Sequence, residues 1–152
     1  MNEKILNNNL ETIKHIDDVR ANLYIFITDL IQRAKDHDAS KLQSPEQEIF
    51  GEYGGELGKV EYGSEEYKKL LEKVKPAIDH HYSKNRHHPE HFSSGIRGMD
   101  ILDVVEMLAD WSAATKRNKN GNIHKSIEHN KTRFNMSEDL VAILENTVNR
   151  YF

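Results

Sequence analysis

The sequence predicts an all-α fold, and three observations lead to this conclusion. Apolar residues recur at three- and four-residue steps along several segments, which is the period of an amphipathic helix. Serines suited to capping a helix, the first of them followed by proline, stand at Ser44, Ser64 and Ser137. Alternation of apolar and polar residues is weak throughout the 152 residues, so strands are not expected.

Six helical segments are expected along the chain. The first runs from Leu10 to about Ala34, and its apolar stripe consists of Ile13, Ile16, Val19, Leu23, Phe26, Ile27 and Leu30. A short second helix starts at residues 44–46 and fades into the glycine-rich residues 51–58. The third follows Ser64 and is expected to bend or restart at Pro76. After an ordered loop at 83–98, helices are expected at 99–117, 123–134 and from Ser137 towards Tyr151.

One domain is expected, because the length of the chain suits a single core. The prediction places a flexible segment at residues 1–9 and the domain at 10–152, with its core at 10–117 and C-terminal helices at 123–152. The last helix has Leu140, Ile143, Leu144, Thr147 and Val148 on one side. That side is expected to pack either internally or against a second copy in a homo-oligomer.

Composition narrows the classes of function. The chain has no cysteine, so disulfides, thiolate metal sites and cysteine nucleophiles are excluded. A formal net charge of −4 argues against broad nucleic-acid binding, although a small anionic substrate in a locally basic pocket is still allowed. No apolar run reaches the length of a membrane span and no signal-peptide core is seen, which favours a cytoplasmic protein without membrane contact.

Histidines and carboxylates at unexpected places indicate a candidate site. His15 lies in the apolar stripe of the first helix, where a lone histidine is more often a core residue than a ligand. Asp103, Glu106 and Asp110 share one stripe of the apolar helix at 99–117, and buried carboxylates need cations or donors. His37 and Asp38 directly follow the first helix and suit a metal that takes nitrogen and oxygen ligands. Alone, this pair also reads as an ordinary turn.

In order along the chain, His15, His37-Asp38 and Asp110 resemble the H…HD…D signature of the HD-domain metal-dependent phosphohydrolase superfamily. "HIDDV" at 15–19 looks like the helix of the first histidine, and "HDASK" at 37–41 is similar to the HD-x-[GS]-K form. "HHYSKNRHHP" at 80–89 resembles the double-histidine segment of the HD-GYP branch. "HDASK", "NRHHPEHF" and "DVVEMLADWSAAT" together also resemble a small uncharacterised bacterial and phage family attached to this superfamily.

The resemblance implies an HD-type helical bundle whose His15, His37, Asp38 and Asp110 bind one divalent ion: manganese, iron, cobalt, nickel, zinc or magnesium. Branches with two metals usually have a further histidine before the double-histidine segment, and no histidine stands between Asp38 and His80 here. A second metal site is therefore in doubt, and residues 80, 81, 87 and 88 either bind a second ion or contact phosphate. No GYP motif follows, so hydrolysis of cyclic-di-GMP is not supported.

The activity expected from this resemblance is hydrolysis of a small phosphorylated molecule, such as a nucleotide, at the metal. Asp38 or Asp110 would orient the attacking water, and Lys41 would neutralise charge on the phosphate. Each of the remaining expected contacts could instead be an ordinary solvated side chain or part of a polar loop. Catalysis is assigned to Asp38, Lys41, His81 and Glu106, with Glu106 holding a ligand histidine; phosphate contacts are assigned to Lys41, His80, Lys84, Arg86, His87 and His88.

Two other functions remain open from the sequence. An HD-fold oxygenase would use paired irons to activate oxygen, although the missing histidine weighs against this reading. A degenerate site in a bacterial or phage module would bind a nucleotide signal or a partner protein without turnover. The complete H…HD…D set argues against a degenerate site without turnover.

Overall fold

The computed structural model describes residues 2–56, 59–61, 63–117 and 119–152, and all of their regular elements are helical. The all-α prediction is confirmed. The elements, with η for short 3₁₀ helices, are α1 (Glu3–Asp36), η1 (Ala39–Leu42), α2 (Glu46–Tyr53), α3 (Glu65–Lys84), η2 (Pro89–His91), η3 (Gly95–Gly98), α4 (Ile101–Thr115), α5 (Ile123–Phe134) and α6 (Glu138–Tyr151).

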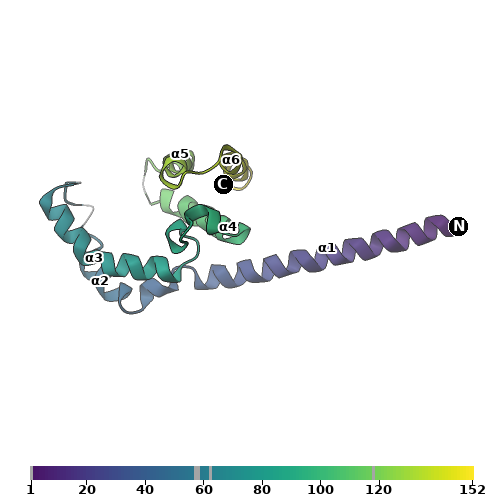
Figure 1. The fold of residues 1–152 in the computed structure, drawn as a ribbon, viewed down its shortest axis with the longest axis horizontal. Helices are drawn as coiled ribbons and strands as arrows, with labels where there is room; N and C mark the ends of the chain where they lie inside the picture. Colours follow the sequence, from purple (N-terminus) through teal and green to yellow (C-terminus); the bar gives the residue numbers. More distant parts are fainter. Residues whose placement is uncertain (1, 57–58, 62, 118) are drawn as a thin grey trace. The chain divides into compact units, whose positions relative to one another are not determined.

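The chain forms two compact units, Met1–Asp36 and His37–Phe152, where the sequence predicts one domain over 10–152. The first unit is α1, one uninterrupted helix drawn in purple to blue in Figure 1. Residues 3–9, predicted to be flexible, are helical. No residue of α1 is buried, and most of its apolar stripe is exposed, because a lone helix has no second surface to pack against within its own unit.

The second unit has its apolar core among its last three helices. Helix α4 packs beside α5, and α5 beside α6 (Figure 1). Their buried side chains are Leu108, Ile127, Met136, Leu144 and Val148. Since Leu144 and Val148 belong to this core, α6 packs internally. Helices α2 and α3 form a second pair, with Leu70, Val74 and Ala77 of α3 buried.

The helix-start signals are confirmed at two serines and wrong at the third. Ser64 Oγ accepts a hydrogen bond from the Tyr67 backbone N–H at 3.0 Å, and Ser137 Oγ accepts one from Leu140 at 3.2 Å. Ser44 forms no cap, since Pro45 occupies the N-cap position of α2 without a side-chain hydrogen bond. Helix α3 also passes through Pro76 without a break.

Among the described residues, no helix combines the length and the apolar character that a membrane crossing requires.

Candidate metal centre

A tight turn after α1 allows two adjacent side chains, those of His37 and Asp38, to face one site. Asp38 has φ 57° and ψ 12°, a left-handed conformation that aspartate tolerates better than most residues. The turn brings the His37 and Asp38 side chains together, with His37 Nε2 3.6 Å from Asp38 Oδ2. The short helix η1 then begins at Ala39. The pair therefore converges through backbone geometry that its residue types permit.

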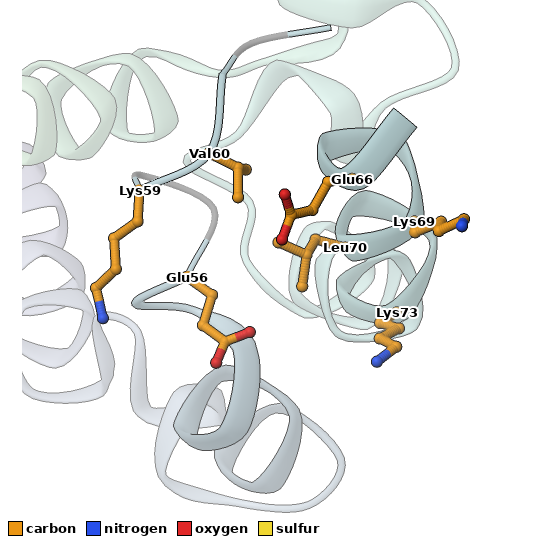
Figure 2. A pocket seen from close by; sticks show the side chains of 7 residues that line it. All are labelled: Glu56, Lys59, Val60, Glu66, Lys69, Leu70 and Lys73. Carbon is orange, nitrogen blue, oxygen red and sulfur yellow. The ribbon is translucent and has the colours of Figure 1, made fainter. Parts of the chain in front are cut away.

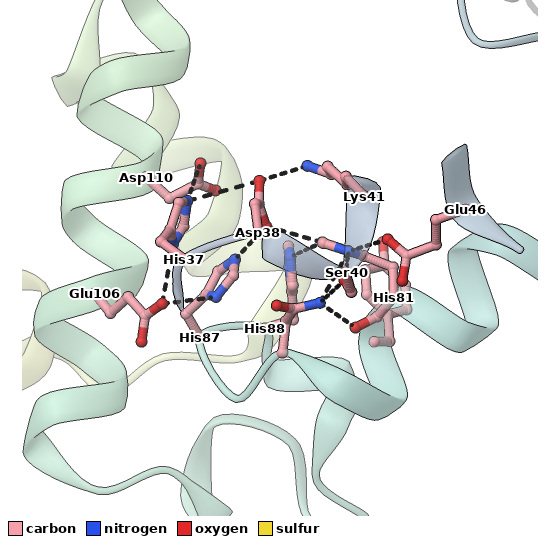
Figure 3. Close-up of polar contacts among 12 residues, drawn as sticks. His37, Asp38, Ser40, Lys41, Glu46, His81, His87, His88, Glu106 and Asp110 are labelled. Carbon is pink, nitrogen blue, oxygen red and sulfur yellow. Dashed lines mark hydrogen bonds and ion pairs between the residues drawn. The ribbon is translucent and has the colours of Figure 1, made fainter. Parts of the chain in front are cut away.

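Helix α4 supplies the carboxylates opposite this turn (Figure 3). His37 Nδ1 lies 2.9 Å from Glu106 Oε1, and His37 Nε2 lies 3.7 Å from Asp110 Oδ1. His37, Asp38 and Asp110 each offer a ligand atom, and these atoms lie within 4.8 Å of one another. Three of the four ligands implied by the H…HD…D pattern are thus brought together.

His15 belongs to the other unit and is in none of the candidate ligand groups among the described residues. Its side chain is exposed on α1, at odds with its predicted place in a buried stripe. At about 1.5 Å per residue, it lies roughly 30 Å before the end of that helix. The ligand role of His15 stays a prediction.

A second donor set lies on the other side of Asp38 (Figure 3). Asp38 Oδ1 is 3.3 Å from His81 Nε2 and 3.5 Å from His87 Nε2. His88 Nε2 is 2.9 Å from His81 Nε2. The four potential ligand atoms lie within 4.8 Å of one another. The sequence left these histidines undecided between a metal and a phosphate, and their geometry favours the metal.

Two atoms of this second set show that its chemistry fits a cation. Asp38 Oδ1 and His87 Nε2 are buried and have no hydrogen-bond partner. Such atoms destabilise a fold unless something satisfies them, by about 1–3 kcal/mol each. A divalent metal accepts a carboxylate oxygen and several neutral imidazole nitrogens together. The donor set fits such an ion.

Two glutamates orient the imidazoles. A carboxylate can only accept, so the ring nitrogen that faces it must donate. Glu106 Oε1 faces Nδ1 of His37 at 2.9 Å and Nδ1 of His87 at 3.2 Å. Glu46 faces Nδ1 of His80 at 2.7 Å and Nδ1 of His81 at 2.8 Å. His37, His81 and His87 therefore present Nε2 to Asp38, which is how metal-binding histidines are commonly held.

Sequence reasoning assigned this orienting role to Glu106 and missed Glu46. Glu46 is fully buried in the first turn of α2. Burial alone raises the pKa of its carboxyl, but hydrogen bonds from His80, Ser40 and His81 outweigh that effect and lower it. A glutamate directly after Ser-Pro reads as a favourable charge at a helix start. The one signal against that reading is its contact with histidines 34 and 35 residues away, which only the fold reveals.

Glu46→Gln is expected to weaken metal binding by about 10- to 100-fold, the usual effect of removing a group that orients a ligand histidine. A glutamine has one acceptor oxygen and cannot serve both imidazoles. Competition with a fluorescent chelator measures the affinity. Glu48→Gln, an exposed position on the same helix, is the matched control and should bind metal as the wild type does. Equal affinities for the two variants would remove Glu46 from the centre.

Burial keeps the centre in the protonation state that a metal needs. Desolvation lowers the pKa of His81, and together with the charges of His87 and His81 it lowers the pKa of His88 to about 3. Burial alone raises the pKa of Asp38, but the hydrogen bond and charge of Lys41, with His37 and His81, lower it overall. The imidazoles of His81 and His88 are therefore neutral and the Asp38 carboxyl is ionised near neutral pH.

The metal-free protein is expected to lose stability as the pH falls below about 6.5, the pKa of an unfolded histidine. His88 has its lowered pKa only in the folded state, so the unfolded chain binds the extra proton between that value and about 6.5. His88→Gln should therefore show a shallower fall in the free energy of unfolding from about pH 7 to about pH 5. Urea titrations measure it. His129→Gln, at an exposed position, should keep the wild-type slope, and a His88→Gln slope equal to it would contradict the burial of His88.

The other residues predicted to contact phosphate have different environments in the structure. Lys41 Nζ donates to Asp38 Oδ2 at 2.6 Å and is 43% exposed, so its charge lies at the open side of the centre. Lys84 ends α3 with an exposed side chain. His80 Nδ1 is held by Glu46, and the side chain is partly exposed.

Arg86 is engaged elsewhere, which counts against its predicted contact with phosphate. Its guanidinium donates to both oxygens of the fully buried Asp103, at 3.0 and 2.9 Å, and to Asp100 at 3.2 Å. Asp103 belongs to the carboxylate stripe of α4, where a buried carboxylate needs a cation or donor. For this carboxylate the cation is an arginine, and Arg86 ties the loop before η2 to the start of α4.

A cavity of about 480 Å³ lies away from this cluster, between the end of α2 and the start of α3 (Figure 2). Its charged lining residues are Glu56, Lys59, Glu66, Lys69 and Lys73. None of its lining residues belongs to the candidate metal centre. This cavity therefore has no histidine among its lining residues.

Comparison with known proteins gives one match. The model of a family of unknown function, DUF5662, matches residues 4–150. No curated protein and no solved structure matches the chain.

Proposed function

The chain belongs to the family of unknown function DUF5662, and we propose that it is a metal-dependent phosphohydrolase acting on a small phosphorylated molecule, a nucleotide. One observation carries the proposal. Asp38 Oδ1 and His87 Nε2 are buried without partners, and one ligand atom each from Asp38, His81, His87 and His88 lie within 4.8 Å of one another. Three imidazoles and a carboxylate gathered in this way form a site for a cation.

Two ions can be held by the residues present. One set is His37, Asp38 and Asp110, and the other is Asp38, His81, His87 and His88. Asp38 belongs to both, with Oδ2 towards His37 and Oδ1 towards His81 and His87. When bound, a divalent ion supplies a Lewis acid that polarises a phosphoryl oxygen and makes water more acidic.

The chain's own residues bind the anion and move the proton. The exposed ammonium of Lys41 attracts the phosphate and offsets the charge that develops on it. Asp110, partly exposed on α4, accepts a proton from the attacking water. The water oxygen forms the new bond to phosphorus, the bond to the leaving oxygen breaks, and that oxygen takes a proton from solvent. Glu46 and Glu106 keep the imidazoles in one tautomer throughout.

A phosphate-release assay tests this function. The protein is stripped with a chelator, reloaded separately with manganese, iron, cobalt, nickel, zinc or magnesium, and incubated with nucleoside mono-, di- and triphosphates. Release is expected only with metal. Tight nucleotide binding without release under every metal would instead favour a sensor module, and oxygen uptake with iron would favour an oxygenase. Either result contradicts the hydrolase.

A further inference from the structure

A second cavity, of about 290 Å³, shares one imidazole with the candidate metal centre. His88 contributes to both: its Nε2 faces His81, and its ring lines the cavity beside Tyr82, with 4.9 Å between the ring centroids. The volume is at the lower limit of the roughly 300–1,000 Å³ usual for small-molecule sites. It suits one ring system of a ligand whose remainder lies outside, towards the metal centre.

The walls of this cavity are flat and aromatic. Trp111 of α4 and Phe134 of α5 lie nearly parallel, with 9° between their planes and 6.3 Å between their centroids. Arg133 packs over the Phe134 ring and pairs with Glu90 at 2.6 Å, which holds one side of the mouth in place. Aromatic side chains of this kind stack on the face of any nucleobase, because every base has a π-face.

Asn130 of α5 offers a polar side chain to the cavity. Asn130 is 9% exposed and lines the cavity. An amide offers a donor and an acceptor together, the pair that matches the edge of a nucleobase. Asn130 is therefore the lining residue suited to contact the edge of a base.

We infer that this cavity binds the nucleobase of the substrate, with Trp111 and Tyr82 as aromatic contacts and Asn130 as the group that reads the edge of the base. The inference rests on the proposed function for the position of the phosphate, which reaches the metal centre past His88. It adds the class of substrate, a nucleoside phosphate, and the residues that would select it over a sugar phosphate.

Binding of nucleosides, which carry no phosphate, tests the inference apart from catalysis. Adenosine, guanosine, cytidine and uridine are titrated by calorimetry, with emission of Trp111, the only tryptophan, recorded in parallel. At least one should bind and change the emission. Asn130→Leu should weaken that binding about tenfold or more, because both hydrogen bonds to the base are lost.

Asn146→Leu, at an exposed position on α6, is the matched control and should leave binding unchanged. Absence of nucleoside binding, binding without a change in Trp111 emission, or equal affinity in Asn130→Leu would each overturn the inference. The outcome is separable from that of the proposed function. Nucleoside binding without phosphate release keeps the inference and removes the hydrolase. Hydrolysis of nucleotides and ribose 5-phosphate at equal rates, unchanged in Asn130→Leu, keeps the hydrolase and removes the inference.

Discussion

Asp38→Asn is expected to abolish tight metal binding and phosphate release while leaving the protein folded. The two oxygens of Asp38 face both donor sets, so one substitution removes a ligand from each. An amide in place of Oδ1 would also direct N–H groups or a weak neutral oxygen at His81 and His87. Asparagine tolerates the left-handed conformation of this position, which keeps the turn intact.

We expect metal affinity to fall more than about 100-fold, and phosphate release about 10³-fold, since a metal's Lewis-acid contribution amounts to several kcal/mol. Metal content after dialysis and the phosphate-release rate measure the two effects, and circular dichroism checks the helices. Asp79→Asn, an exposed position on α3, is the control. An Asp38→Asn protein that retains metal and wild-type turnover would remove Asp38 from the centre.

His87→Leu is expected to stabilise the metal-free protein and to weaken metal binding. His87 is 2% exposed, and its Nε2 has no hydrogen-bond partner. Replacing that nitrogen by an apolar side chain removes a penalty of about 1–3 kcal/mol in the metal-free protein. Glu106, which faces His87 Nδ1, keeps its contact with His37. The metal-free variant should therefore melt a few degrees above the metal-free wild type.

Metal should act on the two proteins differently. At about 100 times the dissociation constant, a bound ion stabilises the wild type by about 2.7 kcal/mol, roughly a 10 °C rise in Tm. His87→Leu should show little of this rise, because one of four donors is lost. Scanning calorimetry with and without metal measures both effects, and His124→Leu, at an exposed position on α5, is the control. A destabilised metal-free variant that still responds fully to metal would contradict a ligand role for His87.

Much of the helical fold could be predicted from local sequence, because the controlling interactions are local. The helix at 123–134, and the Ser64 and Ser137 caps, depend on residues a few positions apart, and the structure agrees with them. The exposure of the apolar face of α1 could not be predicted in this way. A helical stripe shows that a face is apolar, and it contains no information about what covers that face.

The site was predictable in part for the same reason. His37, Asp38 and Asp110 follow from the H…HD…D order, and the structure brings them together. The fate of residues 80–91 depends on a loop without apolar period, so sequence reasoning could not separate His80, held by Glu46, from His81, which faces Asp38. Likewise, Arg86 looked like a phosphate ligand until its buried partner Asp103 was known.

The most direct test of the centre is anomalous diffraction from crystals soaked in manganese or zinc, recorded on either side of the metal's absorption edge. We expect a peak at bonding distance, about 2.0–2.3 Å, from Asp38 Oδ1 and the Nε2 atoms of His81 and His87. A peak only elsewhere on the protein, or none at saturating metal, would contradict it.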